Sequence, residues 1–166
     1  MSTLVVFSGP PGVGKSTLSY KLAYKKGWAL LTKDQIERSL EKSKIVNGKA
    51  AYDLLFDIAK LNLQNRVSVI IDAVIGNSSL RDQLTHIAKE TNAKLIVIVC
   101  TCSDISLWQK RIEGRLEVVE GWTPADWEEV KRVQGYYEKW STPHLIVDAI
   151  DPINENFSKI ESYVKD

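Results

Sequence analysis

Apolar positions along the chain follow two alternating patterns. Short, nearly continuous apolar runs at residues 4–8, 28–31, 67–72, 95–100 and 145–147 predict strands of a buried parallel sheet. Between them, helical periodicity predicts helices at residues 15–25, 34–42, 50–65, 78–91, 104–114, 123–140 and 154–164. This alternation predicts an α/β fold with right-handed crossovers. Ligands bind beyond the carboxyl ends of strands in such sheets, so the residues just after each strand are the candidates for function.

The segment after the first predicted strand reads GPPGVGKS at residues 9–16 and fills the G-x-x-x-x-G-K-[ST] pattern. Its glycines permit positive φ, so that backbone N–H groups can surround an anion: Gly9, Gly12 and Gly14. In this motif Lys15 reaches the β- and γ-phosphates, and the Ser16 hydroxyl holds Mg²⁺. The remaining positions expected to line the nucleotide are Pro10, Pro11, Val13 and Thr17. We therefore predict a site for Mg²⁺ and a nucleoside triphosphate, ATP.

Asp34 and Arg38 lie four residues apart at the start of the second predicted helix and therefore share one helical face. A carboxylate beside the γ-phosphate could accept the proton of an attacking hydroxyl, and an arginine could bind an anionic acceptor. The alternative is an Asp N-cap with an exposed helical ion pair. The residues alone favour neither interpretation.

Asp72 ends the third predicted strand, where a single acid can hold the Mg²⁺ shell or orient the acceptor. The next residue is Ala73 rather than a glutamate that would activate water, which weighs against a water-using ATPase. The alternative is an aspartate that merely ends a strand.

Arg111 and Arg115 end the helix that follows the fourth strand. One guanidinium could stack on a base while the other neutralises the transferring phosphate. We expect residues 111–126 to form a small lid that excludes water. A solvated basic helix end, stabilised by the helix dipole, is the alternative.

The amino-acid composition limits the class of protein but does not identify its chemistry. The 166 residues, 44% hydrophobic and 26% charged, are typical of one globular domain. The net charge of +1 makes no general case for nucleic acid or a membrane as partner. Cys100 and Cys102 lack zinc-site spacing and are expected to be reduced thiols. There is no leader pattern and no apolar run near eighteen residues, so we expect a cytoplasmic protein.

Taken together, these residues resemble a small P-loop kinase. The RIEGR run at 111–115 resembles the start of the adenylate kinase lid, which implies adenine stacking by Arg111 and phosphate contact by Arg115. The segment TKDQIER at 32–38 resembles the D-x-x-x-R segment of polynucleotide 5′-hydroxyl kinases. Chloramphenicol phosphotransferase and zeta-toxin-like kinases place a catalytic aspartate similarly. The resemblance implies that Asp34 is the base, that Arg38 aids phosphate binding and transfer, and that a three-layer, five-stranded sheet has the order 2-3-1-4-5.

Three functions fit these motifs. The favoured one is an ATP-dependent kinase that phosphorylates a nucleic-acid 5′-OH, a sugar or another small hydroxyl compound, with Asp34 as base. A nucleoside monophosphate kinase needs arginines more than a base, since its acceptor is already an anion. A nucleotide-binding ATPase or switch needs no acceptor at all.

Overall fold

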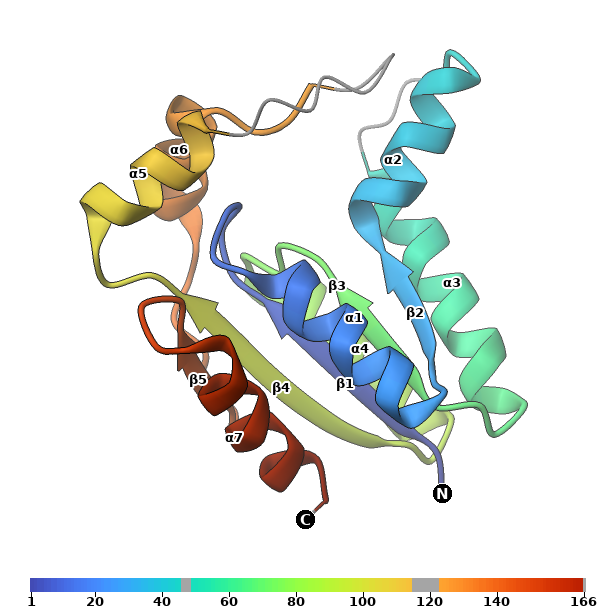
Figure 1. Ribbon diagram of the computed structural model, residues 1–166. Helices are drawn as coiled ribbons and strands as arrows, with labels where there is room; N and C mark the ends of the chain where they lie inside the picture. Colours follow the sequence, from blue (N-terminus) through green and yellow to red (C-terminus); the bar gives the residue numbers. More distant parts are fainter. Residues whose placement is uncertain (46–48, 115–122, 166) are drawn as a thin grey trace.

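The computed structural model describes residues 1–45, 49–114 and 123–165, and these contain the predicted strands and helices (Figure 1). The strands are β1 (Thr3–Ser8), β2 (Ala29–Thr32), β3 (Val69–Asp72), β4 (Lys94–Thr101) and β5 (Leu145–Asp148). The helices are α1 (Lys15–Lys26), α2 (Lys33–Lys42), α3 (Ala50–Gln64), α4 (Ser78–Glu90), α5 (Ile105–Glu113), α6 (Trp127–Tyr136) and α7 (Ile153–Lys165).

The five strands form one parallel sheet of order β2-β3-β1-β4-β5, as predicted. β1 lies at the centre, so the segment that leaves it is flanked by the carboxyl ends of β3 and β4. Such a position places ligand-binding residues at a topological switch point.

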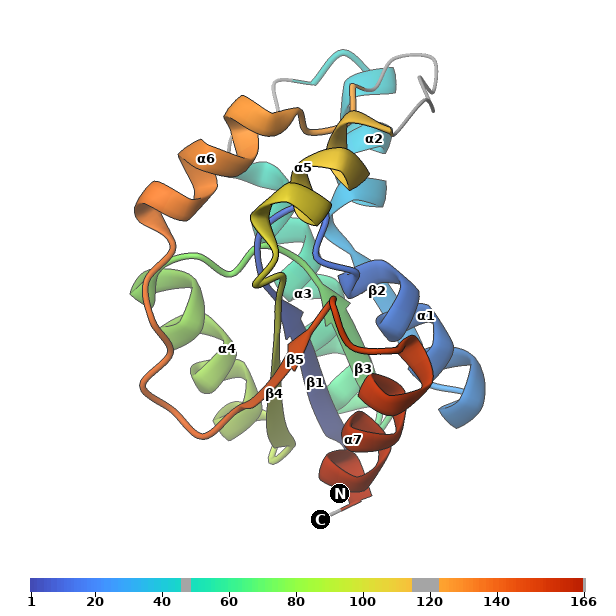
Figure 2. The same ribbon diagram turned by 60° about the vertical axis from the view of Figure 1, so that its left-hand side comes forward.

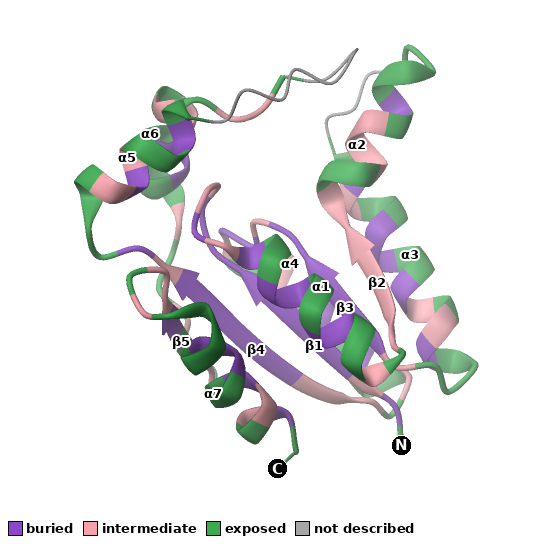
Figure 3. Ribbon diagram, in the orientation of Figure 1, coloured by how far each residue is buried: buried purple, intermediate pink, exposed green. Residues whose placement is uncertain are grey.

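Helices cover both faces of the sheet, which confirms the three-layer arrangement (Figure 2). Side chains of β1 alternate between the two layers because successive residues of a strand point to opposite faces. Val5 and Phe7 pack in the core beneath α1 and α7, whereas Leu4 and Val6 pack in the core beneath α3 and α4. Figure 3 shows the consequence: buried residues fill β1, β3 and the centre of β4.

Two helix ends can be compared with the ends predicted from the sequence: the end of α1 and the start of α6. Gly27 ends α1 in the left-handed conformation at φ 64°, and its N–H donates to the Ala23 carbonyl at 2.8 Å. The expected helix start at Thr123 and Pro124 is wrong, because α6 begins at Trp127. There the side chain of Asp126 caps the helix by accepting from the Glu129 N–H at 2.8 Å.

No helix in the described ranges is long and apolar enough to cross a membrane.

Two isoleucines in paired strands test the proposed core. Ile98 of β4 is fully buried, whereas Ile146 of β5 is 58% exposed. We expect Ile98→Ala to lower the free energy of unfolding by roughly 2–5 kcal/mol, because it removes buried methyl groups and leaves a cavity. Ile146→Ala should cost less than about 1 kcal/mol. Urea denaturation of both variants would measure the difference, and equal losses would contradict the assigned core.

Candidate functional site

The glycine-rich loop between β1 and α1 has the backbone that the motif predicts. Gly9, Gly12 and Gly14 adopt φ angles of 145°, 84° and 85°, which are rarely accessible to other residues. Lys15 is only 9% exposed, and its ammonium donates to the Pro10 carbonyl at 2.8 Å. The Lys15 side chain therefore lies against the phosphate loop.

The sheet and α5 hold this loop closely from two sides. A Cβ atom at Gly9 would lie 2.2 Å from the Cys100 carbonyl oxygen of β4, and one at Gly12 would lie 2.5 Å from the Ile112 side chain. The Trp108 indole N–H donates to the Pro11 carbonyl at 2.8 Å. Glycine is thus required at Gly9 and Gly12 for close approach as well as for conformation.

Trp108 also links the loop to α6. Its ring meets Trp127 edge-to-face, with centroids 5.6 Å apart and an interplanar angle of 86°. Nothing in the spacing of these tryptophans along the sequence indicates that one donates to the phosphate loop. That contact depends on how α5 packs against the loop, which is a feature of the tertiary structure.

Asp72 lies at the carboxyl end of β3 and is 6% exposed. The Ser19 hydroxyl donates to its Oδ2 at 3.3 Å. Burial raises the pKa of the Asp72 carboxyl above its ordinary value, against the opposing effects of the Lys15 ammonium and a hydrogen bond with Ser16. Ionisation of the Asp72 carboxyl group is therefore unfavourable unless a further cation binds beside it.

The Ser16 and Asp72 side chains fit a Mg²⁺ ion. Both supply oxygen, the ligand type that Mg²⁺ prefers, and they lie within hydrogen-bonding reach of each other. No cluster of three or more His, Cys, Asp or Glu side chains suited to a metal occurs among the described residues. Two protein ligands match the way in which Mg²⁺ is bound together with nucleotide phosphates.

A cavity of about 450 Å³ opens between the loop, α2 and α6. Besides residues of the loop backbone, it brings together the side chains of Lys15, Ser16, Asp34 and Asp72, to which the sequence assigns chemical roles. Asp34 is not the N-cap of α2, because Thr32 accepts from the Gln35 N–H instead. Its carboxylate forms no hydrogen bond or ion pair with any residue that the structure describes.

Arg38 lines a smaller hollow of about 160 Å³, together with Asp34, Ser16 and Asp72. These last three residues also line the larger cavity. Because Thr32 caps α2, the alternative in which Asp34 is the N-cap is wrong.

A second cavity, of about 560 Å³, lies across the loop from the first. Gly12, Val13, Gly14 and Thr17 line it on one side, and the segment from Ala149 to Ile153 lines it on the other. Arg111 reaches into this region and donates to the Ala149 carbonyl at 3.1 Å. Thr17 lines both cavities, which shows that they meet along the start of α1.

Arg115 and most of the expected lid, residues 115–122, lie outside the described residues. Of the lid expected at residues 111–126, the structure describes the end of α5 and residues 123–126 before α6. Figure 1 shows α5 and α6 on one side of the loop and α2 on the other.

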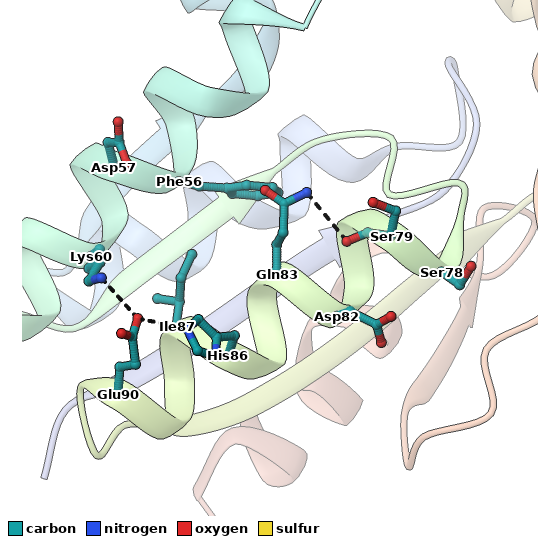
Figure 4. A pocket seen from close by; sticks show the side chains of 10 residues that line it. All are labelled: Phe56, Asp57, Lys60, Ser78, Ser79, Asp82, Gln83, His86, Ile87 and Glu90. Carbon is teal, nitrogen blue, oxygen red and sulfur yellow. Dashed lines mark hydrogen bonds and ion pairs between the residues drawn. The ribbon is translucent and has the colours of Figure 1, made fainter.

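Another hollow, of about 710 Å³, lies away from this loop between α3 and α4 (Figure 4). Three of its polar residues interact there, because Glu90 binds Lys60 at 2.9 Å and lies 3.4 Å from His86. None of the residues that the motifs single out lines it. The two cavities beside the loop are therefore the candidate site.

The sheet order and the loop define the chain as a P-loop nucleoside-triphosphatase fold. Residues 4–139 match the AAA_33 family, described as an AAA domain, and the chain belongs to that family. An uncharacterized protein of Mycobacterium tuberculosis strain H37Rv is 25% identical over 158 residues, covering 86% of this chain. The chain spans only 31% of the length of that relative.

Several solved structures share the fold. A protein of Chloroflexus aurantiacus j-10-fl, provisionally named a kinase, has a TM-score of 0.75 at 21% identity, covering 99% of this chain and 96% of that chain. A sugar kinase from Janibacter sp. HTCC2649 has a TM-score of 0.74 at 12% identity, covering 99% and 95%. Kti12 of Chaetomium thermophilum, in complex with ADP-AlF3, has a TM-score of 0.70 at 22% identity, covering 97% and 98%. At such identities the likeness shows the fold.

Two glycines of the loop separate conformational strain from steric collision. Gly9 and Gly14 both have positive φ, but only at Gly9 would a Cβ collide with backbone, the Cys100 carbonyl. We expect Gly9→Ala to lower the free energy of unfolding by roughly 2–4 kcal/mol. Gly14→Ala should cost about 1–2 kcal/mol, the strain of a left-handed residue alone. Chemical denaturation distinguishes them, and an equal effect would show that the contact with β4 is unimportant.

Two aspartates should respond oppositely to neutralisation. The raised pKa of Asp72 means that its charged form destabilises the fold at neutral pH, and that this penalty disappears as pH falls through the folded-state pKa. Burial alone would raise the pKa of Asp148, but hydrogen bonds from Ser103 and the Ile150 N–H lower it below its ordinary value. The stability that Asp148 contributes is present above its unfolded-state pKa and is lost at lower pH.

Without Mg²⁺ or nucleotide, Asp72→Asn should therefore raise the free energy of unfolding at pH 7, and Asp148→Asn should lower it. Urea denaturation between about pH 3 and 8 measures both effects. The Asp72→Asn effect should shrink first, as the pH falls below the raised folded-state pKa of Asp72, whereas the Asp148→Asn effect should shrink only below about pH 4, the ordinary aspartate pKa. A loss of stability in Asp72→Asn at pH 7 would contradict the assigned cost of the buried charge.

Proposed function

We propose that this chain is an ATP-dependent kinase that transfers the γ-phosphoryl group to a hydroxyl acceptor. The observation that carries the proposal is the position of Asp34. Its carboxylate faces the same cavity as Lys15, Ser16 and Asp72 and is not engaged by any described residue. A carboxylate in this position could accept the proton of a hydroxyl group that binds in the cavity between α2 and α6.

The two cavities suit the two substrates. The triphosphate would follow the loop, with the base in the cavity beside Arg111 and the β5–α7 segment. Arg111 stacking on adenine remains a prediction from the resemblance, as does phosphate contact by Arg115. The acceptor would occupy the cavity that contains Asp34. In this arrangement the γ-phosphate of ATP would lie next to the acceptor hydroxyl.

The proposed transfer is an in-line displacement. The acceptor oxygen forms a bond to the γ-phosphorus while the bond to the β–γ bridging oxygen breaks, and ADP leaves. Asp34 takes the hydroxyl proton, and Lys15 stabilises the charge that develops on the phosphoryl oxygens. Ser16 and Asp72 would hold Mg²⁺, which neutralises phosphate charge when bound. Arg38 lines the smaller hollow together with Asp34, and from there it would orient Asp34 or bind the phosphoryl group.

A base at Asp34 separates this proposal from its alternatives. With labelled ATP and an active acceptor, Asp34→Asn should lower kcat by about 100-fold or more while the KM for ATP stays nearly unchanged. Lys15→Ala should also be inactive but folded. The matched control is Asp57→Asn on α3, since Asp57 lines the groove away from the loop.

Full turnover by Asp34→Asn combined with loss of activity in Arg38→Ala would favour a nucleoside monophosphate kinase. Hydrolysis in water that no hydroxyl compound accelerates would favour an ATPase. The acceptor is found with a panel of nucleosides, nucleotides, 5′-OH oligonucleotides and sugars, by following which compound takes up the label.

A further inference from the structure

The charged side chains facing Asp34 are largely paired with one another. In α2, the Lys33 ammonium forms an ion pair with Glu37 one turn later. The two side chains are only 19% and 22% exposed, so water screens this pair incompletely. The Lys33 nitrogen also lies 5.1 Å from the centroid of the Tyr52 ring. Lys33 is thus neutralised within the cavity and fixed over an aromatic face.

A second pair faces the cavity from α6. Arg132 binds Glu129 through two parallel hydrogen bonds, Nε to Oε2 at 2.7 Å and Nη2 to Oε1 at 2.6 Å. This bidentate arrangement uses one edge of the guanidinium, which a phosphate could otherwise bind. The hydrogen bonds from Arg132 also lower the pKa of Glu129, so that the carboxylate stays charged.

The charge balance around the acceptor follows from these pairs. Apart from Lys15 and Asp72 at the phosphate loop, the described lining has two cations and three carboxylates: Lys33 and Arg132, with Asp34, Glu37 and Glu129. Arg38 lines the smaller hollow that shares Ser16, Asp34 and Asp72 with this cavity, so it brings the cations to three. A phosphate monoester carries a charge of about −1.5 to −2 at neutral pH. Placed here, it would find no surplus of positive charge to balance it.

We propose that the acceptor is an uncharged polyhydroxyl compound of the sugar or polyol class, and not a phosphate-bearing molecule such as a nucleotide. This inference rests on the proposed kinase function. Hydroxyl groups can donate to the Glu37 and Glu129 carboxylates as well as accept from their paired cations, whereas a phosphate dianion can only accept. The Tyr136 ring lines the same cavity, is exposed, and suits the apolar face of a sugar ring.

The proposed reaction joins one acceptor oxygen to the γ-phosphorus and releases ADP, with the hydroxyl proton passing to Asp34. The products are ADP and a phosphate monoester of the acceptor. That product carries the charge that the cavity disfavours, which promotes its release. The same electrostatics that select a neutral substrate would therefore oppose product retention.

Matched acceptor pairs test the inference, because the members of each pair differ by one phosphate group. Labelled ATP is offered with glucose and glucose 6-phosphate, myo-inositol and inositol monophosphate, or adenosine and AMP. We expect transfer to the uncharged member of at least one pair, with kcat/KM at least about tenfold above its phosphorylated counterpart. Such a pair then serves for the variants.

Glu37→Gln and Glu129→Gln each remove one carboxylate and release its cation. Each should raise the kcat/KM of the phosphorylated member relative to the uncharged one by about fivefold to tenfold. Glu161→Gln is the matched control, since it breaks the ion pair with Lys25 outside the cavity. It should leave the ratio unchanged.

The outcomes separate this inference from the function on which it rests. A phosphorylated acceptor used as well as its uncharged counterpart, or better, overturns the inference while the kinase proposal stands. Variants that leave the ratio unmoved overturn it as well, because the paired charges would then not determine selection. No transfer to any member overturns both proposals.

Discussion

The close contact between the phosphate loop and the end of β4 is the constraint on which the site depends. Gly9 lies so near the Cys100 carbonyl that even a methyl group would not fit. Because β1 and β4 are paired through Ser8, the loop leaves the sheet at a fixed height and direction. The loop then turns directly into α1, so that the backbone N–H groups of the loop and of the first turn of the helix point toward one site.

This constraint also explains the cost of Asp72. β3 pairs with β1 up to Phe7, so its last residue is carried to the edge of the loop and buried there. Ser19 and Lys15 compensate the carboxylate only in part, since its pKa remains raised. The protein thus retains an unfavourable charge where a cation could bind, which is the usual relation between stability and function at such sites.

Sequence reasoning predicted the conformation of the phosphate loop, and Asp72 at the end of its strand, well, because backbone conformation and strand ends depend on local patterns. The sheet order came from the resemblance. The hollow that Arg38 lines and the Trp108 contact to Pro11 could not be predicted, because the positions of α2 and α5 decide them. The Lys33–Glu37 pair has visible i,i+4 spacing, but spacing alone does not show which pairs face a cavity.

The two halves of the site are supported by different parts of the fold. The proposed donor half rests on strand ends, which the register of the sheet fixes. The proposed acceptor half rests on α2 and α6, and residues just after α6 contact the end of β1. There the Tyr137 hydroxyl meets the Ser8 hydroxyl at 2.6 Å, and Trp140 donates to Tyr137 at 3.0 Å.

Ser8 is the last residue of β1 and immediately precedes the phosphate loop. A shift of α6 on binding an acceptor would therefore act through Tyr137 on the residue that orients Gly9. The Trp108–Trp127 contact joins the same helix to the other side of the loop. Acceptor and donor binding would then be coupled through two contacts that meet the loop at its beginning and its middle. Coupling of this kind needs only differential contacts in the two occupied states.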